Sequence, residues 1–591
     1  MKALWHLNKY FIRYKWRLLL GFLFVVISVI FKIFPAQLVR TSFDSVELVV
    51  TQYRAGEIND MGNLRQSLLL YGLGIIVSAL LSGVFMFFMR QTIIVISRYI
   101  EFDLKNEIYE HYQKLSLSFY KRNSTGDLMN RISEDVSRVR MYIGPAVMYA
   151  VNVFFTLVIV IAIMIDINPT LTFYVLLPLP LLSYAIYRIS QTINHRSERV
   201  QSTLSDISTF VQEAFSGIRV VKAYTQEKRS SQSFNDLANH YKNVQEGLFK
   251  VNALFFPMMM LLIGLSTLIT VYVGGLESIH GEISAGNIAE FILYVNMLTW
   301  PVASIGWVTS IVQRAEASQE RINAFLKTPP EIMSSLGAVK DYGNSIAFRN
   351  VSFTYPDTGI IAIKNLSFEI ASGQTLAIVG RTGSGKSTLA NLVLRLMDTK
   401  EGEVQIGGVN IKNVDLNVLR QKTGYVPQEA FLFSDTIANN IGFSRQTFDQ
   451  NEIETAAKQA EVYTNIEEFP QKFETKVGER GITLSGGQKQ RVSIARALIH
   501  QPEILIFDDC LSAVDTETEE RILQNLKQLT KNRTTLIISH RVSTVKHADH
   551  ILVLGNGELL EEGSHEDLLE RKGEYFSLYE KQLREQHEHT V

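Results

Sequence analysis

A glycine-rich segment near the middle of the chain has the residue types and spacing of a phosphate-binding loop. Residues 380–387 follow the pattern Gly-x4-Gly-Lys-Ser, between a β-rich run, Thr375–Val379, and an amphipathic helix. Glycines let backbone amides surround phosphate oxygens, and the helix N-terminus adds partial positive charge. Lys386 is predicted to neutralise the β and γ phosphates, and the Ser387 hydroxyl to ligate Mg²⁺. This context disfavours a chance glycine-rich turn. The predicted binding residues are Gly380, Arg381, Thr382, Gly383, Ser384, Gly385, Lys386, Ser387 and Thr388.

A second apolar strand ends in a carboxylate that suits the same site. The sequence ILIFDD places Asp508 at the end of this strand. A carboxylate there can hold Mg²⁺ through water and complete a triphosphate site. The alternative is an aspartate that caps a helix after a buried strand. The phosphate-binding loop favours the metal role.

A second anion site is predicted at LSGGQKQRVSIARALI, residues 484–499. Ser485, Gly486, Gly487 and Gln488 offer a hydroxyl and bare amides at the start of a strong helix. One domain needs only one triphosphate cradle. A second makes sense if it closes over a nucleotide held by another copy or a partner, so we expect a dimer with two nucleotides between its subunits.

The elements that position these residues belong to a chain of mixed character. Its 591 residues are 46% hydrophobic and 20% charged, with a net charge of -1, which indicates two or more folded domains. Neither nucleic-acid binding nor disorder is indicated by this balance. Cys510 is the single cysteine, so an intrachain disulfide framework and a cysteine-rich metal site are excluded. The 12 histidines show no ligand spacing.

The first half contains six apolar stretches that are predicted to span a membrane, which takes about 20 helical residues. They lack the polar stripe of buried helices in soluble proteins. The first counts as a span if Lys32 is tolerated near its end and the helix continues through Phe34. The predicted spans are Leu18–Phe31, Gln66–Met89, Met141–Ile165, Ile167–Tyr187, Val251–Leu276 and Phe291–Gln313.

The distribution of charged residues predicts how these spans are oriented across the membrane. Residues 1–17 are basic and aromatic without an acid, which suits a helix on the cytoplasmic face. Segments 90–140 and 188–250 are long, basic and helical in pattern, so the membrane helices should extend into the cytoplasm and turn near Gly126 and Gly217. Both termini are predicted to be cytoplasmic, in a multi-pass protein of the cell (inner or plasma) membrane. Lys32 either snorkels to the interface, which its position favours, or faces an anionic substrate.

After Gln313 the pattern changes to an amphipathic helix, a polar linker and then alternating β-rich runs and helices, as in an α/β domain. The predicted fold class is an α-helical membrane bundle of six helices with long cytoplasmic extensions, joined to an α/β P-loop NTPase domain. The predicted parts are residues 1–17 (N-terminal elbow helix), 18–325 (transmembrane domain), 326–343 (linker), 344–580 (nucleotide-binding domain) and 581–591 (polar tail).

In combination, these motifs make about residues 1–580 resemble an ATP-binding cassette (ABC) exporter half-transporter of the multidrug and lipid-flippase type. The resemblance implies ATP and Mg²⁺ as cofactors. It also implies docking of the two cytoplasmic turns, SFYKRNSTGDL and FSGIRVVKAYT, on nucleotide-binding domains, the second on that of the partner. Its implied roles are adenine stacking by Tyr355, Mg²⁺ contact by Gln428, sensing of the turns by Glu479, interface crossing by Ser512 and Asp515, and a γ-phosphate switch at His540.

Asp509 departs from the family pattern, which has glutamate after the metal-binding aspartate as the base that polarises water. One methylene fewer withdraws the carboxylate by ~1.5 Å, and errors near 1 Å can cost ~100-fold in rate. We therefore expect strong ATP binding, weak hydrolysis at this site, and a heterodimer whose partner carries the glutamate. The alternative is a homodimer in which Asp509 is a slower base. The catalytic candidates are Asp509, His540 and Gln428.

The predicted function is ATP-driven export of an amphipathic drug, lipid or peptide, with alternation between inward- and outward-facing states. The partners are a second half-transporter, membrane lipid and the unidentified substrate, without nucleic acid. The alternative is a nucleotide-gated regulatory or channel-like subunit that does not pump.

Overall fold

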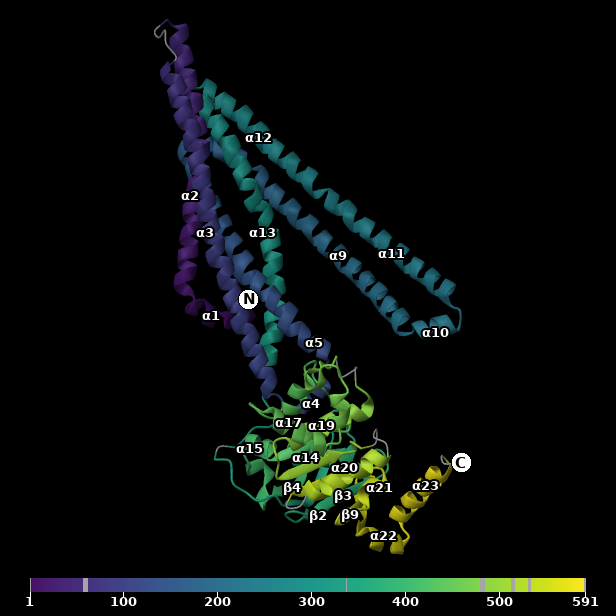
Figure 1. The fold of residues 1–591 in the computed structure, drawn as a ribbon. Helices are drawn as coiled ribbons and strands as arrows, with labels where there is room; N and C mark the ends of the chain where they lie inside the picture. The colour runs from purple at the N-terminus through teal and green to yellow at the C-terminus, as the bar shows by residue number, and fades with distance from the viewer. Residues whose placement is uncertain are drawn as a thin grey trace. The chain divides into compact units, whose positions relative to one another are not determined.

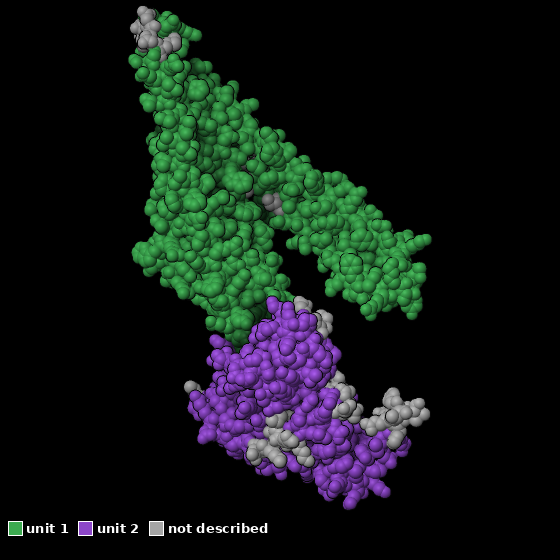
Figure 2. Space-filling view, viewed as in Figure 1, with its two compact units in different colours: residues 1–113, 126–328 green, residues 114–125, 329–591 purple. Residues whose placement is uncertain are grey.

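The computed structural model describes residues 2–56, 62–335, 337–478, 484–511, 516–529 and 533–588. The chain forms two compact units (Figure 2). The first comprises residues 1–113 and 126–328, and the second comprises residues 114–125 and 329–591. Residues 114–125, which belong to the first predicted cytoplasmic turn, therefore group with the second unit.

The first unit is entirely helical in the residues that the structure describes (Figure 1). Several of its helices are far longer than the roughly 20 residues needed to cross a membrane, because polar and apolar segments join without a break. Two π-helical turns, Arg131–Asp135 and Tyr142–Ala146, lie in the stretch from α5 to α7. The helices are α1 (Asn8–Arg13), α2 (Lys15–Arg54), α3 (Gly62–Lys114), α5 (Thr125–Asn130), α6 (Val136–Met141), α7 (Val147–Ile167), α8 (Pro169–Leu176), α9 (Pro178–Ser216), α10 (Ile218–Ala223), α11 (Glu227–Ala253), α12 (Phe255–Ile279) and α13 (Ala285–Leu326).

Within the described residues, five helical stretches are long and apolar enough to cross a membrane: α2, α3, Thr125–Ile167, Glu227–Ile279 and α13. The one remaining predicted span, Ile167–Tyr187, is divided between α8 and the start of α9. The division lies at Leu177, directly before Pro178, because proline has no backbone N–H and crowds the preceding turn. Lys32 lies exposed on α2.

The predicted helical extensions and both predicted turns are confirmed. In the first unit, α9 and α11 run side by side and the short helix α10 lies at their turn (Figure 1). Gly217 is the residue that ends α9. The other turn contains α4 (Leu117–Arg122) and α5, in which Gly126 lies.

The second unit contains two sheets. The larger has the strand order β10-β9-β3-β8-β7-β6, and its β9-β3-β8-β7-β6 part is parallel. The smaller is antiparallel, in the order β2-β1-β4-β5. The strands are β1 (Ile346–Thr354), β2 (Ile361–Ile370), β3 (Thr375–Gly380), β4 (Glu401–Ile406), β5 (Val409–Asn410), β6 (Thr423–Val426), β7 (Ile504–Asp508), β8 (Thr534–Ser539), β9 (His550–Gly555) and β10 (Glu558–Gly563).

Helices cover the parallel sheet on both faces, as the predicted α/β fold requires. Successive side chains of a strand point to opposite faces, so Ile506 of β7 packs with Leu389 of α14, whereas Leu505 packs with Val492 of α19. Helix α23 continues to Glu588, so most of the predicted polar tail is helical. The helices are α14 (Lys386–Val393), α15 (Leu416–Gln421), α16 (Ile437–Gly442), α17 (Gln450–Gln459), α18 (Tyr463–Glu467), α19 (Gly486–Leu498), α20 (Thr516–Leu529), α21 (Val542–Val545), α22 (His565–Arg571) and α23 (Glu574–Glu588).

Strand order brings the predicted site residues to one edge of this sheet. β3, β8 and β7 are parallel neighbours, and their carboxyl ends are Gly380, Ser539 and Asp508. The loops that follow these ends must therefore lie close together, although the loop after β3 is more than 100 positions before the other two in the sequence.

Candidate nucleotide-binding site

The loop between β3 and α14 requires glycine at two positions. Gly385 has φ of +95°, and a Cβ there would lie 2.2 Å from the carbonyl oxygen of Ala362. A Cβ at Gly380 would lie 2.2 Å from the carbonyl oxygen of Leu554. Gly385 is also the N-cap of α14 and offers no side-chain acceptor. No side chain therefore caps the first turn, and amides such as those of Lys386 and Ser387 are left for an anion, which is the property that a phosphate cradle needs.

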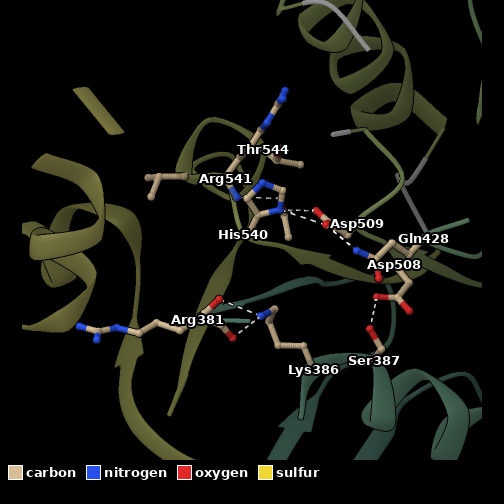
Figure 3. Close-up of polar contacts among 12 residues, drawn as sticks. Arg381, Lys386, Ser387, Gln428, Asp508, Asp509, His540, Arg541 and Thr544 are labelled. Carbon is tan, nitrogen blue, oxygen red and sulfur yellow. Dashed lines mark hydrogen bonds and ion pairs between the residues drawn. The ribbon is translucent and has the colours of Figure 1, made fainter. Parts of the chain in front are cut away.

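The Lys386 ammonium is held inside this loop. Its Nζ donates hydrogen bonds to the carbonyl oxygens of Gly380 at 2.7 Å and Arg381 at 2.8 Å (Figure 3). Burial lowers the pKa of Lys386, and the carboxylates of Asp509 and Asp508 oppose that shift. The Arg381 side chain instead pairs with Glu574 of α23 at 2.9 Å. Lys386 is thus the cation that the loop itself orients.

A hydroxyl and a carboxylate from adjacent strands meet beside the loop. Ser387 Oγ donates to Asp508 Oδ1 at 2.8 Å (Figure 3). Asp508 is 3% exposed, and burial raises its pKa, as does the charge of Asp509, while the bond from Ser387 acts in the opposite direction. Buried oxygen ligands of this kind fit Mg²⁺, which binds proteins through one or two carboxylates and hydroxyls. The residues present therefore fit the predicted metal.

Asp509 joins two other predicted residues. The His540 ring Nδ1 lies 2.8 Å and 3.0 Å from the two carboxylate oxygens of Asp509, and Gln428 Nε2 donates to Asp509 Oδ2 at 3.2 Å (Figure 3). The Asp509 backbone is left-handed, with φ of +47°. Gln490 Nε2 donates to the Gln428 carbonyl at 2.6 Å and fixes that residue from α19. A carboxylate held against an imidazole beside a phosphate loop can accept a proton from water.

The hydroxyl group of Tyr355 contacts the loop 380–388. Its oxygen is 2.9 Å from Thr388 Oγ1, and its ring packs edge-on against Phe353 with centroids 5.1 Å apart. Lys121 of α4 places its Nζ 4.8 Å from the centre of the same ring. Sequence reasoning missed Lys121 as a neighbour of this tyrosine, and the only available signal was its place in the turn sequence SFYKRNSTGDL.

Ser485 and Gln488 form a reciprocal cap at the start of α19. The Gln488 amide donates to Ser485 Oγ at 3.3 Å, and the Ser485 amide donates to Gln488 Oε1 at 2.9 Å. Gly486 and Gly487 open the helix. In the described part of the chain, no hydrogen bond or ion pair joins these four residues to the loop 380–388. Glu479, Ser512 and Asp515 lie outside the described residues.

Comparisons with known proteins agree with this architecture. The family "ABC transporter transmembrane region" matches residues 17–302, and the family "ABC transporter" matches residues 363–512. The chain is 36% identical to an ATP-dependent lipid A-core flippase of Syntrophus aciditrophicus, over 87% of this chain and 85% of that protein. It is 38% identical to a probable multidrug resistance ABC transporter ATP-binding/permease protein, YheI of Bacillus subtilis, over 81% and 82%.

A solved structure has the same fold. It is a bacterial Atm1-family ABC exporter with ATP bound, with a TM-score of 0.79 and 28% identity, and the match covers 96% of this chain and 99% of that one. The glycine loop and the buried Asp508 lie within the residues that match the ABC transporter family, and most of the apolar helices lie within those that match its transmembrane region. The chain belongs to the ABC transporter family: it is a multi-span membrane exporter that carries a transmembrane domain and a cytoplasmic ATP-binding domain on one polypeptide.

Proposed function

We propose that this chain is one half of a dimeric exporter that uses ATP to move an amphipathic drug, lipid or peptide out of the cytoplasm. Relatives named as a lipid A-core flippase, a probable multidrug resistance ABC transporter and a multidrug resistance-like ATP-binding protein support the lipid and drug classes of this range. The observation that carries the proposal is the geometry at Gly380–Ser387. There, a glycine cradle, a buried ammonium and a hydroxyl–carboxylate pair form one triphosphate site.

The signature segment supports dimerisation. Ser485 caps a 13-residue helix that begins at Gly486, yet Ser485 to Gln488 make none of the polar contacts of the chain's own phosphate loop in the described residues. A helix N-terminus of this kind suits an anion. In the proposed dimer it covers the γ-phosphate of the nucleotide bound to the partner.

Exposed apolar side chains at the α10 turn support a second intersubunit contact. Phe215 and Tyr224, on either side of α10, are 72% and 73% exposed, and α10 itself buries no residue. Apolar side chains gathered on a surface in this way mark a docking site. In the proposed dimer this turn packs against the partner's nucleotide-binding domain.

A hollow on the nucleotide-binding domain has a complementary character. Its volume is about 750 Å³, and its lining includes Tyr425, Phe443 and Arg496. Phe433 stacks on Phe443 with ring centroids 4.6 Å apart, and both rings are exposed. This aromatic surface can receive the apolar α10 turn of another chain, so ATP-driven closure of the two domains would pull the membrane helices with it.

Within the site we assign distinct roles to the chain's own residues. Lys386 binds phosphate oxygens, Ser387 and Asp508 hold Mg²⁺ with Gln428, and Tyr355 stacks on adenine. Bound Mg²⁺ supplies charge neutralisation on the phosphate oxygens. Asp509 orients water and takes its proton, and His540 holds that carboxylate in place.

The short Asp509 side chain supports a heterodimer. Its carboxylate is tied to His540 and Gln428 at 2.8–3.2 Å, so it has little freedom to advance toward a γ-phosphate. We propose that this site binds ATP strongly and hydrolyses it slowly, and that a partner with glutamate at this position provides the faster site. The signature Ser485–Gln488 then completes the partner's site.

Vesicle transport with purified protein tests the proposal. Inside-out vesicles that contain the exporter should concentrate a fluorescent amphipathic substrate only with hydrolysable ATP. Lys386→Ala should abolish the uptake and the photolabelling of this chain by an azido-ATP analogue. Lys364→Ala removes an exposed lysine that pairs with Glu558 and should change neither.

The same preparation tests whether the chain forms a homodimer or pairs with a second half-transporter. An affinity-tagged chain should co-purify with a second half-transporter, and the pair should hydrolyse ATP faster than this chain alone. A fully active homodimer would contradict the heterodimer. Equilibration of substrate without accumulation would contradict pumping and indicate a channel-like subunit. Unchanged azido-ATP labelling of Lys386→Ala would contradict the site assignment.

A further inference from the structure

The basic N-terminal segment and α3 form an open surface hollow with an unusual charge balance. It is lined by Arg13, Tyr14, Trp16, Arg17 and Tyr99 and has a volume of about 440 Å³, which lies in the common range of about 300–1,000 Å³ for small-molecule sites. Tyr14 stacks on Tyr99, with centroids 6.0 Å apart and planes at 19°. The aromatic pair gives the hollow a rigid floor.

The acidic side chains of the facing helix are already paired. Asp103 accepts from Arg13 Nη1 at 2.9 Å and from the Tyr14 hydroxyl at 3.0 Å. Glu107 accepts from Lys9 at 2.6 Å. Glu101 pairs with the basic side chains of Arg98, Lys105 and Arg140. From Arg98 to Glu107 of α3, no carboxylate is left over for the remaining cations.

Two of those cations, Lys15 and Arg17, form no ion pair among the residues that the structure describes. Lys15 Nζ lies 5.6 Å from the centre of the Trp16 ring, and the Arg17 guanidinium lies 5.4 Å from the centre of the Tyr99 ring. Cation–ring contacts leave the N–H donors at the guanidinium edge able to bind another acceptor. The lining residue Arg17 therefore keeps unused N–H donors, and Lys15 adds positive charge beside the lining residue Trp16.

The position along the chain indicates what the acceptor is. The apolar run of α2 begins at Leu18, directly after Arg17, so the hollow lies at the level of lipid headgroups on the cytoplasmic side. Trp16 is 75% exposed, as expected for a tryptophan at a membrane interface. Leu19, Leu20 and Leu23 are exposed on the next turns of α2 and can contact acyl chains.

We propose that this hollow binds the phosphate of one anionic glycerophospholipid from the cytoplasmic leaflet. The Arg17 guanidinium binds the phosphate through its planar pair of N–H donors. Lys15 adds positive charge, Trp16 covers the glycerol region, and the exposed leucines of α2 receive the acyl chains. The bound lipid adds a membrane anchor to the packing of the N-terminal segment on α3.

Native mass spectrometry of the full-length transporter in detergent tests this site with phosphatidylglycerol as the probe. Wild type should retain one phosphatidylglycerol per chain and bind phosphatidylcholine at least tenfold more weakly. Arg17→Gln should weaken phosphatidylglycerol binding at least twentyfold, and Arg17→Lys, which keeps the charge without the planar fork, should fall between. Lys2→Gln is the matched control, since it removes one exposed charge from the same basic segment.

The Lys2→Gln control distinguishes a specific lipid-binding site from diffuse attraction to anionic lipid. Diffuse attraction contributes about 1 kcal/mol, or about fivefold in affinity, for any cation near the surface. Equal weakening by Arg17→Gln and Lys2→Gln would overturn the proposal, as would equal affinity for the two lipids. Displacement of the lipid by millimolar glycerol 3-phosphate would also overturn it, because the site would then recognise free phosphate. If Arg17→Gln is not monodisperse, Trp16→Ala replaces it, with the same expected loss of binding.

Discussion

Lengthening the side chain at Asp509 should speed ATP hydrolysis at this chain's own site. In Asp509→Glu the carboxylate moves outward by one carbon–carbon bond, ~1.5 Å. The present carboxylate is fixed by contacts of 2.8, 3.0 and 3.2 Å to His540 and Gln428, so the wild-type side chain cannot make up that distance by rotation alone. Because a positioning error near 1 Å can cost ~100-fold, we expect turnover to rise between tenfold and about 100-fold.

The same substitution should carry a small cost in stability. Residue 509 has a left-handed backbone, with φ of +47°. Aspartate adopts this conformation more readily than glutamate because its short side chain can hydrogen-bond locally, and the whole penalty for a left-handed residue is only about 1–2 kcal/mol. Asp509→Glu should therefore melt a few degrees lower and still fold.

Phosphate release by the full-length transporter in proteoliposomes measures the effect, with the partner's site inactivated by its own lysine substitution. Asp509→Asn is the matched control: it keeps an oxygen that accepts from Gln428 but loses the charge, so it should bind ATP normally and hydrolyse less than wild type. If Asp509→Glu bound ATP normally and did not exceed wild-type turnover, the reach of the carboxylate would not limit hydrolysis, and the slow-site reasoning would be refuted.

Three other substitutions test the structure. Gly385→Ala should abolish nucleotide binding in an azido-ATP labelling assay, because its Cβ would lie 2.2 Å from a backbone oxygen. The control Gly383→Ala, at φ of +83° with no atom within 4 Å of the added Cβ, should retain most of the labelling. Equal losses of labelling would contradict the steric argument. Burial lowers the pKa of His500 below its ordinary 6.5, so the unfolded chain takes up the proton first as pH falls. Stability should therefore decline as pH falls below 6.5, and His500→Gln should reduce that decline in melting curves between pH 8 and 5.5; parallel curves would contradict it. Glu290→Ala should lower the free energy of unfolding by about 2 kcal/mol, because it leaves the fully buried Tyr294 hydroxyl, which donates to Glu290 Oε1 at 2.7 Å, without its acceptor. Glu282→Ala, at an exposed site, is the control in thermal unfolding, and equal melting temperatures would count against the buried pair.

Local sequence was sufficient for features that depend on neighbouring residues. The loop 380–388 could be predicted as a strand, a glycine turn and a helix because φ restrictions and strand patterning act within a few residues. Five of the six apolar stretches could be predicted as membrane-crossing helices for a similar reason, since length and hydropathy are local properties. The break at Leu177 was not predicted, because length and hydropathy take no account of the backbone N–H that Pro178 lacks.

Contacts between distant segments could not be predicted from such patterns. Asp509 meets Gln428, 81 positions away, only because β6 and β7 are neighbours in the sheet. Residues 114–125 join the later unit, where Arg122 and two serines contact Glu331, and Lys121 reaches Tyr355. Arg17 lacks a carboxylate partner among the described residues because the acids of α3 near it pair with other cations.

The sequence by itself determined that this protein has a glycine loop between a strand and a helix, a carboxylate at the end of an apolar strand, and helices long and apolar enough to cross a membrane, because residue type and short-range spacing impose them. The tertiary structure decided which side chains surround Asp509, where the first cytoplasmic turn packs and which cations stay unpaired. Those outcomes depend on strand order and on packing between helices far apart in the chain, which no local spacing encodes.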